Sequence, residues 1–395
     1  MRRIYFDHQA TTDLHPEVKE ILISSLSLFG NPQTIYYEGR KAKEALERAR
    51  KEVAELINAS PEEVFFTSSG AESNNWAIKG IALANQGKGN HIIASPIEHI
   101  SILTPLKRLQ NLGFSVTFLP VDQYGRVDPD EVKKAIRKET ILITIQHASN
   151  EIGTIQNLEE IGRFAQEAGI ALHADAVASC GHYPIDVQKL NVSSLALSAH
   201  TFYGPKGVGS LFIKKGTKIF PLIEGGWQEE GRRAGTENLL GIIGMGKACA
   251  VAKREMGNWI ERIKPLRDRL IREIPAQIER SYLTGHPTER LFHHTSFCFE
   301  FIEGEALLLY LDEEGIASAS GSACTSRTLK SSHVLQAIGI DPVLAQGSII
   351  FSLGRENTED DITYLLTKLA PIVERLRQMS PLYDRYLKEK KIKGG

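Results

Sequence analysis

A turn of small residues in the first quarter of the chain could bind an anion. Residues 65–75 read as a strand, a turn that reaches Gly70 and Ala71, and the first turn of a helix. Backbone N–H groups at such a helix N-terminus are free to stabilise a phosphate. Small residues also begin helices for structural reasons alone, so this motif by itself does not decide between the two explanations.

Further polar groups follow predicted strands. His99 comes after strand 91–95 and could lie flat on an aromatic ring, although a lone histidine is more often a hydrogen-bonded polar residue. Asp175 ends an apolar strand, where a carboxylate could pair with a pyridinium nitrogen, cap a helix or join a surface ion pair. Ser198 and His200 precede a Gly-Pro turn and could donate hydrogen bonds to a phosphate.

These motifs occur together with six others in the order found in one enzyme family. The others are Tyr5–Thr12, Gly30–Pro32, Asn150–Thr154, Arg233–Thr236, Ser320–Cys324 and Ser352–Arg355. From about residue 4 to about residue 376 the chain resembles the cysteine desulfurases, which are class-V aminotransferases. The long loop that continues after Cys324 is similar to that of the NifS/IscS branch of the family.

The resemblance implies a site for pyridoxal 5′-phosphate in a homodimer. The family takes sulfur from L-cysteine, leaves L-alanine, and passes the sulfur to an iron–sulfur scaffold protein or another acceptor. By resemblance, the cofactor ring contacts His99, Asp175 and Asn150. The phosphate is held by the residues Gly70, Ala71, Ser198 and His200, with Thr236 reaching in from the partner subunit. Arg355 and Asn150 bind the substrate, and a planar guanidinium suits its carboxylate.

Cys324 is the expected nucleophile and sulfur carrier, because the family holds the sulfur as a persulfide on a loop cysteine. Such a thiolate needs access to its target and a lowered pKa. Buried packing is the usual role of a single cysteine, but the small polar residues around Cys324 argue against it. Cys180, Cys249 and Cys298 have apolar neighbours, and for them packing is the preferred explanation.

One position departs from the family in a way that concerns the chemistry. Where the family has the lysine that forms a Schiff base with pyridoxal phosphate, this chain has Thr201. A hydroxyl cannot form an imine or take over the proton transfers of an amine. Lys206 and Lys330 are candidates to replace it, and Ala178 stands where the family has a glutamine near the ring hydroxyl. We therefore expect any bound cofactor to be held non-covalently.

Two hypotheses of function follow. The first is a desulfurase-family protein of sulfur mobilisation and iron–sulfur cluster assembly with a degenerate cofactor site. The second is a non-catalytic sulfur-relay or cluster-assembly partner that uses Cys324 as a persulfide carrier or cluster ligand. No other metal site is expected. A related lyase that acts on another amino acid is a third possibility, equally affected by Thr201.

Composition narrows the class of protein. Lys and Arg number 47 against 48 Asp and Glu in 395 residues, which argues against a general role at nucleic acids or membrane surfaces. The N-terminus lacks the apolar core of a secretory signal, and no run of about 18 apolar residues exists. The four cysteines form no CxxC motif, which fits the reducing cytoplasm.

The elements that must position these residues alternate between strands and helices. Apolar runs predict strands at 64–67, 91–95, 115–120, 141–146, 170–174, 194–197 and 209–213, with helical patterns between several of them. This alternation predicts a mainly parallel sheet covered on both faces, with sites at the carboxyl ends of its strands. Long helical patterns at 41–59, 245–280 and 360–377 flank it, with short strand-like runs at 295–301 and 348–353.

The resulting fold class is α/β, with the fold-type I aminotransferase architecture that the resemblance implies. We expect a large domain over residues 16–259 with a seven-stranded sheet, and a smaller α+β domain over residues 260–380 that carries the Cys324 loop. Residues 1–15 are expected to pack with the small domain. Residues 381–395 are charged and end in two glycines, which predicts a mobile tail.

Overall fold

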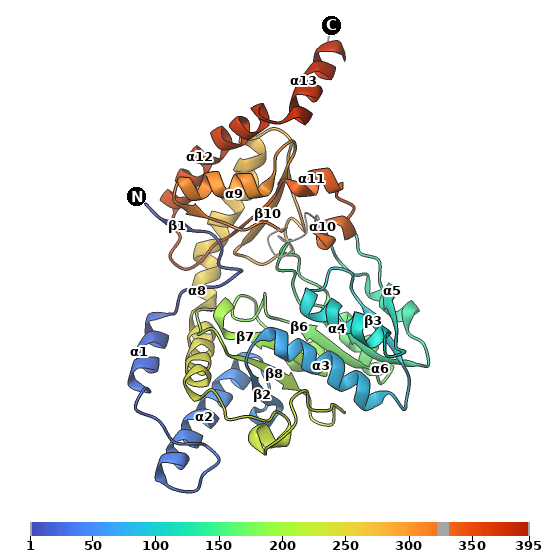
Figure 1. The fold of residues 1–395 in the computed structure, drawn as a ribbon, viewed down its shortest axis with the longest axis vertical. Coiled ribbons are helices and arrows are strands. Elements are labelled where there is room, and N and C mark those ends of the chain that lie inside the picture. Colours follow the sequence, from blue (N-terminus) through green and yellow to red (C-terminus); the bar gives the residue numbers. More distant parts are fainter. Residues whose placement is uncertain (1, 322–331, 394–395) are drawn as a thin grey trace.

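The computed structural model describes residues 2–321 and 332–393 (Figure 1). Cys324 and Lys330 lie outside these residues. In Figure 1 the chain forms a lower part built around one large sheet and an upper part with smaller sheets, and helix α8 (Leu239–Gln277) runs from one to the other.

The large sheet has seven strands in the order β2-β8-β7-β6-β5-β3-β4. Six strands point in the same direction, and β8 is antiparallel to both of its neighbours, β2 and β7. The predicted mainly parallel seven-stranded sheet is therefore confirmed. The strands are β2 (Val64–Thr67), β3 (His91–Ala94), β4 (Ser115–Phe118), β5 (Thr140–Thr144), β6 (Ala171–Asp175), β7 (Ser194–Ser198) and β8 (Gly209–Ile213).

Both faces of this sheet are packed, which explains its nearly continuous apolar strands. Along β7, Leu195 and Leu197 belong to one hydrophobic cluster, whereas Ala196 between them belongs to the other. Successive side chains of a strand point to opposite faces, so the two clusters are the two covered sides of the sheet. Only the edge strand β4 is partly exposed along its length.

Helices cover both faces and connect the strands. Helix α8 packs against α2 and α1 in the lower part and against α12 in the upper part. These and the other helices of the lower part are α1 (Pro16–Ser24), α2 (Tyr37–Leu56), α3 (Gly70–Asn85), α4 (Ile100–Gln110), α5 (Pro129–Ala135), α6 (Leu158–Glu167) and α7 (Val187–Leu190), with 3-10 turns η1 (Pro61–Glu63), η2 (Ala199–Thr201) and η3 (Gln228–Gly231).

The upper part contains a three-stranded antiparallel sheet, β12-β10-β9, and a short parallel pair, β1 with β11. The second pair joins the N-terminal residues to a strand more than 300 residues later in the chain. The elements are β1 (Ile4–Tyr5), β9 (Ser281–Leu283), β10 (His294–Phe299), α9 (Gly304–Glu313), β11 (Ile316–Ala317), α10 (His333–Ala337), α11 (Pro342–Gln346), β12 (Ser348–Ser352) and α12 (Glu359–Gln378).

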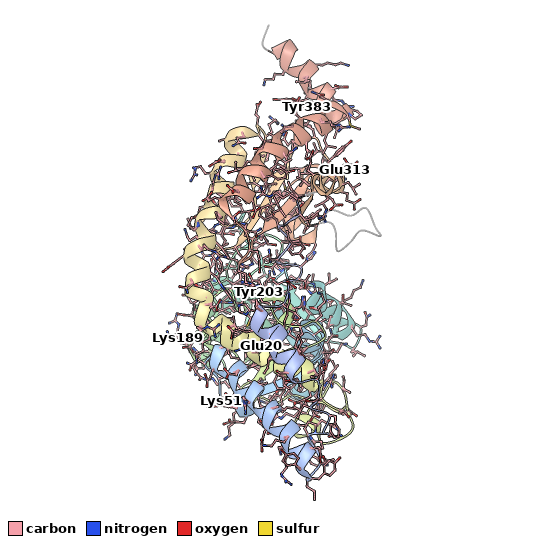
Figure 2. The ribbon with its side chains drawn as sticks, turned by 90° about the vertical axis from the view of Figure 1, so that its left-hand side faces the viewer. Glu20, Lys51, Lys189, Tyr203, Glu313 and Tyr383 are labelled. Carbon is pink, nitrogen blue, oxygen red and sulfur yellow. The ribbon has the colours of Figure 1, made fainter. Side chains whose placement is uncertain are left out.

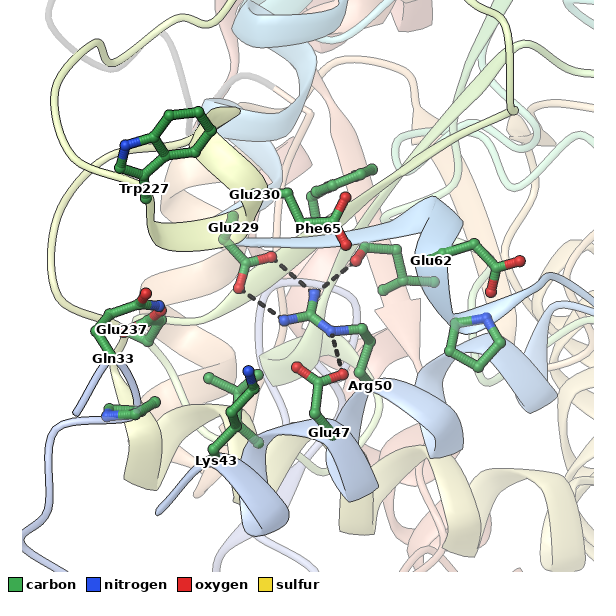
Figure 3. A pocket seen from close by; sticks show the side chains of 14 residues that line it. Gln33, Lys43, Glu47, Arg50, Glu62, Phe65, Trp227, Glu229, Glu230 and Glu237 are labelled. Atoms are coloured by element: carbon green, nitrogen blue, oxygen red, sulfur yellow. Dashed lines mark hydrogen bonds and ion pairs between the residues drawn. The ribbon is translucent and has the colours of Figure 1, made fainter. Parts of the chain in front are cut away.

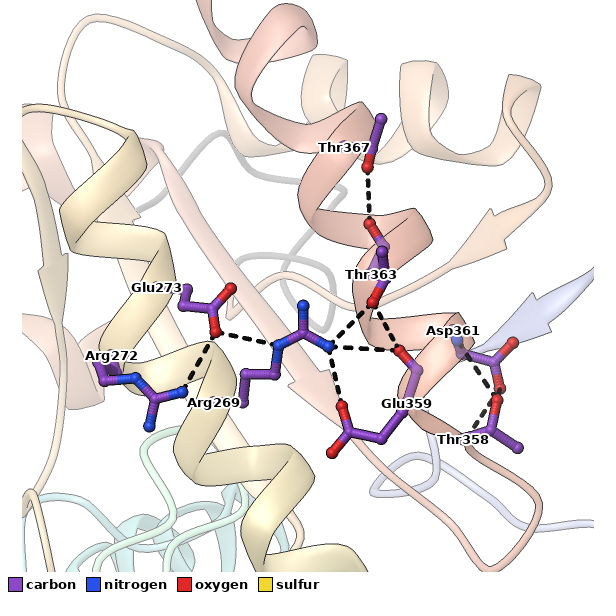
Figure 4. A network of polar contacts seen from close by, with 8 residues as sticks. All are labelled: Arg269, Arg272, Glu273, Thr358, Glu359, Asp361, Thr363 and Thr367. Carbon is purple, nitrogen blue, oxygen red and sulfur yellow. Dashed lines mark hydrogen bonds and ion pairs between the residues drawn. The ribbon is translucent and has the colours of Figure 1, made fainter.

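A polar network ties α8 to α12 in the upper part (Figure 4). Arg269 of α8 lies 2.8 Å from the carboxylate of Glu359 and donates to Thr363 at 2.9 Å. Its Nε also pairs with Glu273 one turn along the same helix. The predicted domain boundary at residue 259 falls inside α8, and the division into domains stays a prediction.

The C-terminal residues form helix α13 (Pro381–Lys393). Its first turns pack on the upper part, because the Tyr386 ring stacks on Phe301 at 5.1 Å between centroids. The mobility of the tail stays a prediction. Among the described residues, no helix is both long and apolar enough to cross a membrane.

Candidate functional site

The carboxyl end of the large sheet faces the N-terminus of α3, and the two approach closely. Ser69 caps α3 by accepting a hydrogen bond from the Glu72 N–H at 3.2 Å. A Cβ added at Gly70 would lie 2.4 Å from Cγ2 of Val177, in the loop after β6. Glycine is therefore required at this position, because only its bare backbone lets the helix start so near the strand ends.

Two side chains at the end of β7, the buried Ser198 and the half-buried His200, each have a buried polar atom without a partner among the described residues. Ser198 is 1% exposed, and neither its Oγ nor Nδ1 of His200 has a hydrogen-bond partner among the described residues. Burial lowers the pKa of His200, and the nearby charge of Lys206 lowers it further. Buried polar groups are almost always hydrogen-bonded, so an unpartnered pair beside a helix N-terminus indicates a ligand site. We call the α3 N-terminus, Ser198 and His200 the phosphate cradle.

The Asp175 carboxylate lies at the end of β6 and is 7% exposed. It accepts hydrogen bonds from Nδ2 of Asn74 at 2.7 Å and from the Val177 N–H at 2.9 Å. Burial nevertheless raises its pKa, and the charge of His99 opposes that shift. A buried carboxylate of this kind favours a cationic partner, such as a protonated ring nitrogen.

His99 is connected to Asp175 through a short polar chain. It precedes α4, and its Nδ1 accepts the Ser101 N–H at 3.1 Å and lies 2.7 Å from the Ser101 hydroxyl. That hydroxyl in turn accepts a hydrogen bond from Asn74 at 2.9 Å. The chain fixes the orientation of the imidazole beside the carboxylate, so the structure brings these two predicted residues together.

Thr201 lies three residues after Ser198 and is 3% exposed. Its hydroxyl is 2.9 Å from O of Val177 and 3.0 Å from O of Ser198, so one proton is shared between two carbonyl oxygens. The backbone oxygen of Thr201 accepts a hydrogen bond from Nε2 of His182 at 2.7 Å. The side chain at this position is therefore held by the protein's own backbone.

Arg355 enters from the upper part, where it follows β12. Its backbone N–H donates to the Tyr203 hydroxyl at 2.9 Å, and its guanidinium carbon lies 5.4 Å from the centre of the Tyr203 ring. Figure 2 labels Tyr203 about midway along the molecule. One guanidinium nitrogen pairs with Glu356 at 2.6 Å, while the buried Nε has no partner among the described residues. Asn150 is half-buried, and its backbone oxygen accepts a hydrogen bond from His294.

Comparison with known proteins identifies the family to which this arrangement belongs. The aminotransferase class-V family profile matches residues 4–365. The chain is 51% identical over 391 residues to the cysteine desulfurase IscS of Dictyoglomus turgidum, covering 99% of each chain. It is 50% identical over 382 residues to the cysteine desulfurase IscS of Methanosarcina thermophila, covering 96% of this chain and 94% of the other.

The chain belongs to the class-V aminotransferases, in the group of cysteine desulfurases. Solved structures agree. A NifS-like protein superposes with a TM-score of 0.89 at 36% identity, covering 95% of this chain and all of that one. The apo cysteine desulfurase of Thermococcus onnurineus superposes with a TM-score of 0.85 at 27% identity, covering 95% of each chain. The fold-type I architecture is thus confirmed.

Cysteine desulfurases and other class-V aminotransferases depend on pyridoxal phosphate. The residues of this chain fit that cofactor at two places: the unpartnered phosphate cradle, and the buried carboxylate of Asp175. They offer no amine at position 201. Lys206 is exposed on the turn that follows η2.

A group of buried histidines lies beneath Thr201, and the sequence analysis did not assign it. The rings of His182 and His293 are 4.1 Å apart between centroids. Burial lowers the pKa of His182 and of His8 to about 4, and that of His293 well below the usual value. Neighbouring histidines also lower the pKa values of His8 and His293. These residues are neutral at pH 7. They are far apart in the sequence, so no local pattern predicted that they would lie together.

Of the remaining predicted site residues, one lies next to the phosphate cradle, one is on a separate exposed segment, and one is outside the described chain. Ala71 is exposed in the first turn of α3, and Thr236 is exposed in the segment between η3 and α8. Cys324 lies outside the described residues. Cys180, Cys249 and Cys298 are buried and unpaired, in agreement with the expected packing role.

Proposed function

We propose that this chain mobilises sulfur from L-cysteine for iron–sulfur cluster assembly, with a cofactor site that holds pyridoxal phosphate without a covalent bond. The observation that carries the proposal is a contrast between two neighbouring hydroxyls. That of Ser198 is buried and unpartnered among the described residues, whereas that of Thr201 is bound to two carbonyls. The phosphate-binding groups are kept, and the covalent anchor is lost.

Each group then has a defined task. Pyridoxal phosphate supplies an electron sink when it is bound. The cradle and the partner's Thr236 would hold its phosphate, Asp175 its ring nitrogen, and His99 its ring face. Arg355 would bind the carboxylate of L-cysteine through two parallel hydrogen bonds. Cys324 would take the sulfur as a persulfide, leaving alanine, and pass it to a scaffold protein or another acceptor.

A second candidate is a sulfur relay without desulfurase chemistry. The observation that favours it is the saturated hydrogen bonding of Thr201, which leaves neither an amine nor a free hydroxyl at that position. Cys324 would then carry a persulfide made elsewhere, or serve as a ligand to an iron–sulfur cluster. The two candidates share the same carrier and differ in whether L-cysteine is cleaved.

A homodimer is part of the proposal. Large apolar side chains are exposed along two segments, 23–37 and 220–227. A hydrogen bond from Gln33 to Glu237 at 3.0 Å joins the first segment to a residue that follows the second. A surface this apolar is typical of a protein interface. Its exposed members are Ile23, Leu26, Phe29, Ile35, Tyr36, Tyr37, Phe220, Ile223 and Trp227.

A reducing compartment such as the cytoplasm suits this chemistry. Three cysteines in the described chain are buried without a disulfide, and persulfide transfer requires a free thiol at Cys324. We propose a cytoplasmic protein that needs neither nucleic acid nor a membrane for its activity.

The test is alanine formation from L-cysteine with a reductant and added pyridoxal phosphate. Alanine that requires both the cofactor and Cys324 supports the desulfurase, with Cys324→Ser as the matched control. If folded protein makes no alanine, the relay is favoured. In that case, sulfur offered as a low-molecular-weight persulfide should label Cys324 and reach an acceptor, and a failure there would eliminate the relay.

A further inference from the structure

The segment that carries Thr236 is held in a strained backbone conformation. In η3, Glu229 and Glu230 have φ values of 47° and 58°, and both therefore adopt the left-handed conformation. Two successive residues with side chains rarely do so, because Cβ is crowded in this region. Such strain persists only where surrounding contacts over-determine the backbone, and it is common in segments that present a functional group.

A buried ion pair provides the first of these contacts (Figure 3). Both guanidinium nitrogens of Arg50 bind Glu229, at 2.8 and 2.9 Å, and the two side chains are only 10% and 2% exposed. The same groups bind the outer edge of β2. Arg50 donates to O of Val64 at 2.6 Å, and the Phe66 N–H donates to Glu229 at 2.8 Å.

The position of β2 gives these contacts their significance. It is the edge strand of the large sheet, so its outer backbone groups have no neighbouring strand. The Arg50–Glu229 pair takes the place of that strand. Since β2 leads directly into the turn before Gly70, the pair fixes segment 228–236 to the same strand that positions the phosphate cradle.

A second ion pair joins the other end of the segment to α3. Arg233 binds Glu72 at 2.9 and 3.3 Å, and Glu72 also accepts the Ser68 N–H at 2.8 Å. The two pairs run in opposite senses, since the segment contributes the carboxylate to one and the guanidinium to the other. Between them and α8, Thr236 is left exposed.

We propose that Arg50–Glu229 and Arg233–Glu72 are positioning pairs that hold this strained segment so that Thr236 reaches the phosphate cradle of a second copy of the chain. The inference rests on the proposed homodimer and goes beyond it, because it assigns the positioning to four residues of the opposite subunit. The exposed Phe220, Ile223 and Trp227 beside the segment supply the apolar contact area between the copies.

Glu229→Gln tests the buried pair, because the amide keeps the size of the carboxylate but loses its charge and one acceptor. In the homodimer we expect affinity for pyridoxal phosphate to fall on the order of tenfold, about what one hydrogen bond to a charged group contributes. The matched control is Glu55→Gln, which breaks the exposed pair with Lys253 and should leave the affinity unchanged. Should Glu229→Gln fail to fold, Arg233→Gln serves for the more exposed pair, and Arg233→Lys should restore part of the affinity.

Mixed dimers separate positioning across the interface from a local structural role. One protomer carries Glu229→Gln and its partner carries His200→Ala, each with its own purification tag, and pyridoxal phosphate is titrated by absorbance. Positioning in trans places both defects in one site and leaves half of the sites with wild-type affinity. Positioning within one protomer damages both sites. An intact dimer in which both sites bind weakly would therefore overturn the inference and leave the homodimer standing. A monomer by light scattering would overturn the inference together with the homodimer.

Discussion

The two ends of the candidate cofactor site differ in how their polar groups are satisfied. At the phosphate end, Ser198 is buried and His200 half-buried, and each has a buried polar atom without a partner among the described residues. Three residues later, Thr201 is equally buried but fully hydrogen-bonded to carbonyl oxygens. Polar groups without a hydrogen-bond partner in the free protein are available to bind a ligand, whereas a fully hydrogen-bonded group stabilises the fold. From this comparison we expect that the protein can lose covalent attachment of the cofactor and still keep the groups that bind it.

The largest effect, on the rate of alanine formation, is expected from Thr201→Lys. This substitution would remove the difference between the two ends of the site. The amine would restore both a covalent bond to the cofactor and the missing acid/base group. Positioned acid/base groups contribute about 10²–10⁴-fold to rates, so alanine formation should rise at least about 100-fold. Alanine is measured at saturating L-cysteine and pyridoxal phosphate, with Thr201→Met as a control of similar length. An unchanged rate would show that another part of the site is defective.

Acid should destabilise the protein through the histidines beneath Thr201. The pKa of His8 and of His182 is lowered to about 4 in the folded state, below the ordinary value of 6.5. The unfolded chain therefore binds more protons between these values. The contribution of the neutral histidines to the free energy of unfolding is complete above pH 6.5 and is lost as the pH falls toward 4. Asp7, whose pKa is raised to about 6, opposes this change, and so do Glu98, Glu151 and Asp175, whose pKa values burial also raises. The histidine contribution is therefore measured by comparing the wild type with a variant that lacks one histidine.

Urea unfolding at a series of pH values measures this effect. Each histidine that is neutral when folded should contribute a slope of roughly 1.4 kcal/mol per pH unit within that window. His182→Gln keeps an N–H donor for the carbonyl of Thr201 but cannot titrate, so its stability should fall less steeply with acid. If wild type and variant lose stability in parallel, His182 is not neutral in the folded protein.

The phosphate end should respond to Ser198→Ala in affinity and not in stability. Its hydroxyl has no partner to lose within residues 2–321 and 332–393, so we expect the free energy of unfolding to change by less than about 0.5 kcal/mol. A lost hydrogen bond to phosphate should weaken pyridoxal phosphate binding about tenfold or more. Calorimetric titration and thermal unfolding of the same sample give both numbers. A large loss of stability with normal affinity would place Ser198 among the structural residues.

Thr201→Val should give the opposite pattern, with the smallest effect. Valine has nearly the same shape but cannot donate to the carbonyls of Val177 and Ser198. The unfolding free energy should fall by about 1 kcal/mol, while affinity for pyridoxal phosphate stays within about twofold. Ser198→Ala should thus change cofactor affinity and not stability, and Thr201→Val should change stability and not cofactor affinity. Equal effects of the two variants on affinity would mean that Thr201 contacts the cofactor.

The sequence predicted the large sheet well, because that sheet depends on local patterns. Each of its strands is an apolar run bounded by helices or turns, and Asp175 and Ser198 end their strands as such runs indicate. The pairing of β1 with β11 was not predicted, since two short strands more than 300 residues apart leave no local trace. Helix α13, which begins at Pro381, was not predicted, because the charged residues and the two terminal glycines indicated a mobile tail.

The candidate site was predicted only in part, for a similar physical reason. Motif order indicated the residues that are expected to contact a cofactor directly. The supporting contacts were missed because they join distant parts of the chain. Arg50 meets Glu229 across 179 positions, and the ring of His182 meets that of His293 across more than 100. Residue identity alone does not show that such groups are buried against one another.

The most direct test of non-covalent cofactor binding is the mass of the protein after loading with pyridoxal phosphate, borohydride reduction and denaturation. Reduction would make any imine to a lysine permanent. The account predicts about one pyridoxal phosphate per protomer before denaturation and an unmodified protein mass afterwards. A stoichiometric pyridoxyl adduct on Lys206 or Lys330 would contradict it, because another lysine would then have replaced the one missing at position 201.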